Sequence, residues 1–145
     1  MEIINKARVY SPWIYHLHCG GCNGCDIEIL AALSPRFDIE RFGIQLVASP
    51  RHADILVTTG PIPKQFEPMV KRVYSQVPEP KVVIAIGSCA CGGSLFYEDS
   101  PENYAIIGSV DRVIPVDVYI PGCPPKPEAI INGIVQAIIK LKNKQ

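Results

Sequence analysis

Apolar residues along the chain follow two different spacings. Short apolar runs rich in β-branched and aromatic residues are typical of strands, and the sequence predicts five, at residues 13–18, 43–49, 54–60, 81–87 and 112–120. Apolar residues at helical spacing predict three helices, at residues 26–33, 64–77 and 128–144. Because strands alternate with helices, we expect an α/β fold built on a doubly wound parallel sheet.

Several predicted elements carry further signals. The run at 81–87 is apolar without interruption, which is typical of a central parallel strand. In the helix at 26–33, the residues Ile27, Leu30 and Ala31 share one face, and Asp26 stands where a first-turn acid is favoured. Residues 98–111 are polar, and we expect them to be irregular.

The composition is that of a folded domain with balanced charge. Of the 145 residues 48% are hydrophobic, and 14 acidic residues balance 14 basic ones. This length indicates a single domain spanning residues 1–145, and the lack of a basic stripe disfavours nucleic-acid binding. No apolar run reaches the roughly 18 residues of a membrane span, and no signal peptide is recognised. We therefore expect a cytosolic chain that reaches a membrane only through a partner.

Six cysteines stand in loops rich in glycine and proline. Because a reducing cytosol does not maintain disulfides, a disulfide framework is not expected. Four of the six follow predicted strands: two come after 13–18, one after 81–87 and one after 112–120. The carboxyl ends of parallel strands share one edge of a sheet, so we expect these four to converge there. These four loop cysteines are Cys22, Cys25, Cys89 and Cys123.

Four converging thiolates fit either a four-iron, four-sulfur (4Fe-4S) cluster or zinc. A zinc ribbon would pair two CxxC units roughly 15–20 residues apart, whereas here the second pair is split between two strand ends. The glycines around them (Gly20, Gly21, Gly24, Gly92, Gly93 and Gly122) favour the cluster, because they let the backbone approach closely and direct N–H groups at its sulfurs. A third reading is a thioredoxin-like dithiol at Cys22-Asn23-Gly24-Cys25. That reading leaves Cys89 and Cys123 without a role.

Four motifs, in order, carry a family resemblance: "CNGCDIEI", "PRHADILVTTGP", "AIGSCACGG" and "PVDVYIPGCPPKPEAI". Between about residues 11 and 141 the chain closely resembles the small subunit of membrane-bound, energy-converting nickel–iron hydrogenases. These are related to the 20 kDa subunit of respiratory complex I. The resemblance implies a flavodoxin-like fold that binds one 4Fe-4S cluster, with the four loop cysteines as ligands for the metal.

The same resemblance implies a function. The chain would be the electron-transfer subunit of an oxidoreductase complex, with no catalytic centre of its own, passing electrons to or from a nickel–iron site. Implied partners are the nickel-binding large subunit, a ferredoxin-like polyferredoxin subunit and integral membrane subunits, at the cytoplasmic side of the membrane. The complex I relatives have adjacent cysteines at the first ligand site, so the spacing of Cys22 and Cys25 favours the hydrogenase branch. Related quinone-linked and sulfur-reducing complexes remain alternatives.

The remaining candidate residues surround these motifs. We expect Cys19 and Cys91 to be reduced thiols that bind no metal, although spacing alone lets Cys19 compete with Cys22. Glu28, Arg51 and His52 are candidates for positions next to the cluster or in a subunit interface. His16 and His18 point to the same face of a strand and are expected to be ordinary strand histidines, with a proton-handling role as the alternative. Tyr10, Trp13 and Tyr15 are candidates for contact with membrane subunits.

Overall fold

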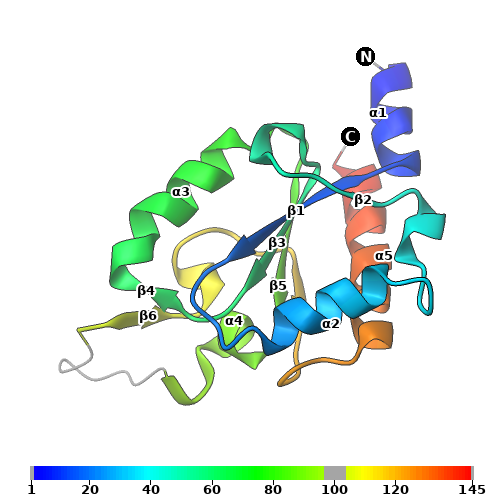
Figure 1. The fold of residues 1–145 in the computed structure, drawn as a ribbon. Helices are drawn as coiled ribbons and strands as arrows, with labels where there is room; N and C mark the ends of the chain where they lie inside the picture. The colour runs from blue at the N-terminus through cyan, green and yellow to red at the C-terminus, as the bar shows by residue number, and fades with distance from the viewer. Residues whose placement is uncertain (1, 97–103, 145) are drawn as a thin grey trace.

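A computed structural model describes residues 2–96 and 104–144, and its centre is a five-stranded parallel sheet (Figure 1). The strands lie in the order β2-β1-β3-β5-β7. Numbered along the chain within this sheet, the order is 2-1-3-4-5, which is that of flavodoxin-like folds. The predicted doubly wound α/β architecture is therefore confirmed. The five strands are β1 (Trp13–His18), β2 (Gln45–Leu46), β3 (Ile55–Thr59), β5 (Val82–Ile86) and β7 (Val118–Ile120).

Helices cover both faces of the sheet (Figure 1). On one face, α2 (Gly24–Leu33) and α5 (Pro127–Asn143) pack on Ile14, Val57 and Ile84 of the strands. On the other face, α3 (Glu67–Gln76) and the short α4 (Ser88–Gly92) pack on Leu56 and Val83. The side chains of neighbouring strand residues alternate between these two apolar layers, and their burial is the main stabilising term of the fold.

The strand register brings four strand ends to one edge. His18 at the end of β1 pairs with Thr59 at the end of β3, and Thr59 pairs with Ile86 at the end of β5. Ile86 in turn pairs with Ile120, the last residue of β7. The loops that follow these four strands therefore leave the sheet side by side, at its carboxyl edge.

Shorter elements complete the described chain. The helix α1 (Glu2–Tyr10) lies beside the C-terminal part of α5 and projects beyond the sheet (Figure 1). A small antiparallel pair joins β4 (Ile62–Pro63) to β6 (Ile106–Gly108). Single 3-10 turns are η1 (Ile39–Phe42), η2 (Pro50–His52), η3 (Lys64–Phe66), η4 (Ser94–Phe96) and η5 (Val110–Arg112). No helix within the described ranges is long and apolar enough to span a membrane.

The structure corrects several predicted elements. The strands predicted at 43–49 and 112–120 shrink to Gln45–Leu46 and Val118–Ile120, because β2 is an edge strand and Pro115 cannot donate to a ladder. The glycine-rich loop expected after the strand at 81–87, which carries Cys89, contains α4. Part of the irregular stretch predicted at 98–111 lies outside the described residues, and its remainder forms β6 and η5.

The helix α2 also buries a different face from the one that the pattern singled out. Its buried residues are Asp26, Ile29 and Ala32, whereas Ile27 and Leu30 are 58% and 59% exposed. The helix is apolar on almost every side, and such a helix gives periodicity no single face to select. An apolar face of α2 is thus left uncovered by the described chain.

Candidate metal centre

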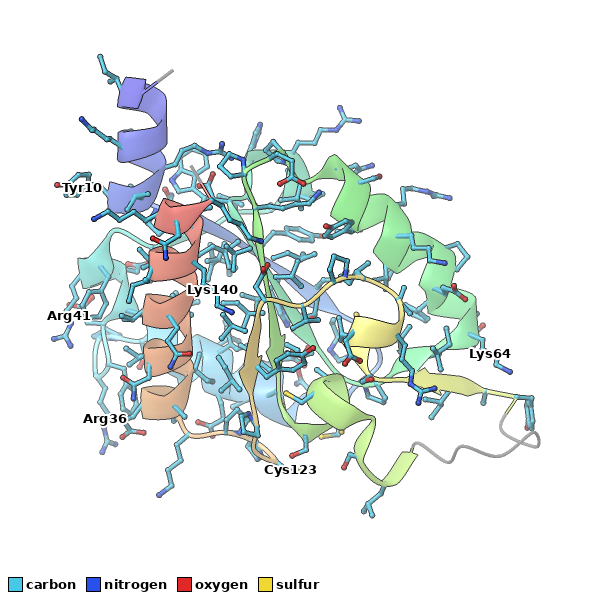
Figure 2. All side chains as sticks on the ribbon, turned by 180° about the vertical axis from the view of Figure 1, so that it is seen from behind. Tyr10, Arg36, Arg41, Lys64, Cys123 and Lys140 are labelled. Carbon is cyan, nitrogen blue, oxygen red and sulfur yellow. The ribbon has the colours of Figure 1, made fainter. Side chains whose placement is uncertain are left out.

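All four loop cysteines meet at the carboxyl edge of the sheet. They line one cavity of about 120 Å³, together with Thr59 at the end of β3 and with residues of the segments that follow β1, β3, β5 and β7. Figure 2 shows Cys123 at the end of the molecule opposite Tyr10, which belongs to α1. The convergence predicted from strand order is confirmed. Metal binding by these thiols stays a prediction.

Backbone hydrogen bonds hold the converging loops against each other. The N–H of Ser88 donates to the carbonyl of Gly122 over 2.8 Å, which joins the loop of Cys89 to the loop of Cys123. The N–H of Cys19 donates to the carbonyl of Thr59 over 2.9 Å, which continues the ladder of β1 and β3 into the loop of Cys22. The cysteines are therefore carried by loops and first helical turns that the sheet itself positions.

Two glycines allow the loops to come this close. Gly60 has φ +84°, and a Cβ there would lie 2.3 Å from the backbone nitrogen of Gly21. Gly87 has φ +92°, and a Cβ there would lie 2.4 Å from Sγ of Cys25. Any larger residue at Gly87 would thus be both strained and pressed against a thiol that lines the cavity.

The thiols differ in burial and hence in acidity. Cys22 and Cys123 are exposed, whereas Cys25 and Cys89 are half-buried. Burial, and after it the charge of Asp26, raises the pKa of the Cys25 thiol to about 11, and burial raises the pKa of Cys89. Because metals bind thiolates, loading of such a site would release protons.

The four cysteines supply the donor set of an iron–sulfur cluster. A 4Fe-4S cluster takes one thiolate at each iron, so its four ligands line a space, as these four cysteines line the cavity. Within residues 2–96 and 104–144, no three His, Cys, Asp or Glu side chains form a group that could hold a metal ion. Occupation of the cavity by a cluster therefore stays a prediction.

The other two cysteines are absent from the described residues that line the cavity. Cys19 has no exposed surface and packs with Leu17 and Leu56 on the face of the sheet opposite α2. Burial first, and then the charge of Asp26, raises the pKa of its thiol to about 12. Cys91 is half-buried and directs its thiol at the carbonyl of Ala85 over 3.4 Å. These positions support the expectation that both are thiols without metal.

Comparison with known families gives the cavity its context. A profile of the family described as NADH ubiquinone oxidoreductase, 20 Kd subunit, matches residues 22–137, a range that contains all four loop cysteines. The chain belongs to this family. The similar proteins include subunits of oxidoreductase complexes. The resemblance that the four motifs indicated is therefore confirmed.

The relatives include subunits of hydrogenase complexes and of NADH-quinone oxidoreductases. The chain is 60% identical to the probable membrane-bound hydrogenase subunit mbhJ of Pyrococcus furiosus, over 90% of this chain and 76% of that protein. It is 47% identical to formate hydrogenlyase subunit 7 of Escherichia coli over 92% of its length, but spans only 51% of that relative. A solved structure of the membrane-bound sulfane sulfur reductase, an archaeal respiratory membrane complex, contains a chain that is 38% identical with a TM-score of 0.80, covering 99% of this chain and 77% of that one.

The three other predicted site residues do not join the cavity. Glu28 is half-buried on α2 and is not among the described residues that line it. Arg51 and His52 precede β3, so they lie at the amino edge of the sheet, where they border a separate hollow with Trp13 and Arg8. Placing Arg51 and His52 beside the cluster was wrong, because a residue before a parallel strand lies at the opposite edge from one after it. An interface role for all three stays a prediction.

Asp26, predicted only as a first-turn acid of a helix, lines the cavity as a buried, hydrogen-bonded carboxylate. Asp26 accepts hydrogen bonds from the hydroxyl of Thr59 over 2.6 Å and from His18 Nδ1 over 2.9 Å, and lies 2.7 Å from His16 Nε2. The signal in the sequence was the alternation of His16 and His18, which places both imidazoles on the side of the sheet that α2 covers.

Proposed function

We propose that this chain is an electron-transfer subunit of a membrane-bound hydrogenase complex. It carries one 4Fe-4S cluster, held by the four loop cysteines. The observation that carries this proposal is the convergence of four thiols, from three loops, on one cavity at the carboxyl edge of the sheet. The 60% identity to a probable membrane-bound hydrogenase subunit supports the choice of complex.

In this role the protein holds, orients and insulates the redox group. A bound cluster supplies one-electron chemistry, and its potential depends on charge, hydrogen bonds and exposure around it. The half-buried Cys25 and Cys89 and the exposed Cys22 and Cys123 would hold it. Gly87 keeps the wall beside Cys25 free of any side chain.

The partner proposed for the outward side is the nickel-binding large subunit. Ile27 and Leu30 form an exposed apolar face on α2, the helix that begins at the cavity with Gly24 and Cys25. Contiguous exposed apolar residues mark interaction sites. A partner seated on this face would also cover the cavity and exclude water from it. Contact with a polyferredoxin-like subunit and with membrane subunits would then attach the chain peripherally to the membrane, on its cytoplasmic side.

Metal analysis and spectroscopy of the full chain test the cofactor. The chain is produced and purified without oxygen, its iron and acid-labile sulfide are measured, and the dithionite-reduced sample is examined by EPR. We expect about four irons per chain and a reduced-cluster signal. Less than about one iron per chain, with no such signal, would refute the proposal. Iron-free chain that reduces disulfides would instead support the dithiol reading of Cys22 and Cys25.

A second candidate function is electron transfer in a sulfur-reducing complex, and the likeness to a chain of the sulfane sulfur reductase complex favours it. Purification of the complex through a tag on this chain distinguishes the two. Nickel in the co-purified large subunit, together with hydrogen production or uptake, supports the hydrogenase. A complex that lacks nickel and reduces sulfane sulfur supports the second candidate.

A further inference from the structure

Asp26 is a buried carboxylate in the wall of the cavity. Only 7% of its surface is exposed, yet both of its oxygens have partners. Thr59 donates to Oδ1, which also lies 2.7 Å from Nε2 of His16, while His18 contacts Oδ2. Buried carboxylates are retained as ions only when such partners are present.

Asp26 and its partners come from three elements that meet at the carboxyl edge. Asp26 lies in the first turn of α2 and directly follows Cys25, while His16 and His18 lie on β1 and Thr59 ends β3. The same carboxylate thus ties the helix that carries Cys25 to two strands of the sheet. Its distance to the cavity cannot change without breaking these bonds.

The surroundings of Asp26 are those of an ionised carboxylate. The hydroxyl of Thr59 donates to Oδ1, and the other close partners are the ring nitrogens of His16 and His18. Asp26 also lines the cavity next to Cys25, so its charge lies in the wall of the proposed site.

We propose that Asp26, held by Thr59, His16 and His18, is a fixed negative charge that lowers the reduction potential of the cluster bound by the adjacent cysteines. This role rests on the proposed function. Reduction adds one electron, and hence one negative charge, to the cluster. A carboxylate held nearby repels that added charge, and net charge around a cluster is one of the terms that set its potential. Asp26 is therefore a positioning and tuning residue that contacts no substrate.

The substitution Asp26→Asn removes the charge and keeps the shape. It is compared with Asp54→Asn, which changes a carboxylate that is equally buried, at 6% exposure, but lies at the amino edge of the sheet with Arg8 and Trp13 as partners. The full chain of each variant, loaded with its cluster, is titrated with dithionite at one pH of about 8.5, above the ordinary imidazole range. The EPR signal reports the midpoint potential.

We expect Asp26→Asn to raise the equilibrium constant for reduction about tenfold, which is about 59 mV for one electron. Asp54→Asn is expected to leave the potential at the wild-type value. The iron content and the shape of the EPR signal should stay unchanged in both variants, because neither residue is a proposed ligand.

A second pair of variants tests the charge without removing Asp26. His18→Lys places a cation beside the carboxylate, and the side chain of His18 is 44% exposed, so a lysine can be accommodated there. His52→Lys is its control, at an exposed histidine of the amino edge. We expect His18→Lys to raise the potential in the same direction as Asp26→Asn and His52→Lys to leave it unchanged.

The outcomes separate this proposal from the proposed function. If the wild-type chain shows no iron–sulfur signal, the proposed function fails and the role of Asp26 fails with it. If the wild-type signal is present but Asp26→Asn and His18→Lys match their controls, only the role of Asp26 is refuted. If Asp26→Asn does not assemble a cluster, His18→Lys and His52→Lys provide the test. A higher potential in His18→Lys alone supports the role of Asp26, and equal potentials refute it.

Discussion

Replacing Cys19 and Cys123 by alanine should separate a structural thiol from a metal ligand. Cys19 has no exposed surface, and its sulfur packs in the apolar layer between the sheet and α3. Deleting one buried heavy atom of this kind destabilises a protein by about 1 kcal/mol. For a chain of this length, that corresponds to a melting temperature lower by about 2–4 °C. We expect Cys19→Ala to show this loss and to keep its full iron content.

Cys123→Ala should behave in the opposite way. Cys123 is exposed, and exposed substitutions usually change stability by no more than about 0.5 kcal/mol. The iron-free variant should therefore have the same melting temperature as the iron-free wild type. When the variant is produced without oxygen, it should contain no iron and give no EPR signal. Circular dichroism under reducing conditions gives the melting temperature, and metal analysis gives the iron. Loss of iron in Cys19→Ala, with iron retained in Cys123→Ala, would show that the ligand set is wrong.

Three further predictions follow from the cavity and its surroundings. Gly87→Ala places a Cβ 2.4 Å from Sγ of Cys25 and should abolish iron binding, whereas Gly92→Ala, where a Cβ meets nothing within 4 Å, should bind iron normally in the same assay. Leu30→Lys on the exposed face of α2 should reduce co-purification of the large subunit severalfold without changing the melting temperature. The matched control is Ile139→Lys, at a 55% exposed residue of α5, and equal losses in both variants would argue against the α2 face. Acid should destabilise the iron-free chain, because the pKa of His16 lies below its unfolded value of 6.5 through burial, so the unfolded state binds more protons as the pH falls below 6.5. His16→Gln should therefore flatten the dependence of the urea midpoint on pH between about 7 and 5, and an unchanged slope would contradict this assignment.

Sequence reasoning placed the four loop cysteines correctly because it needed only the order of strands along the chain. In a parallel sheet every loop after a strand leaves at the same edge, so errors of a few residues in strand ends did not matter. The predicted strand at 112–120 was six residues too long at its start, yet Cys123 still follows its true end at Ile120. Applied to residues before a strand, the same argument places Arg51 and His52 at the opposite, amino edge, which is where the structure has them.

Other features depend on contacts between distant residues and could not be predicted. The helix α1 is anchored by Arg8, whose guanidinium pairs with Asp54, 46 residues further along the chain. The buried face of α2 was unpredictable because its residues are apolar on almost every side. The choice between its faces is made by the sheet, which holds Asp26 through the histidines of β1.

The alternation of side chains along β1 explains both why Cys19 does not line the cavity and why two histidines contact Asp26. Tyr15, Leu17 and Cys19 belong to the apolar layer under α3, whereas Ile14 faces α2 and the imidazoles of His16 and His18 reach Asp26 on that helix. The hydrogen bond from Cys19 to Thr59 extends the strand pattern by one residue, so the side chain of Cys19 must follow Leu17 into the opposite layer. The alternation of side chains along β1 therefore keeps Cys19 out of the cavity and brings His16 and His18 to Asp26. A strand shifted by one residue would exchange these roles.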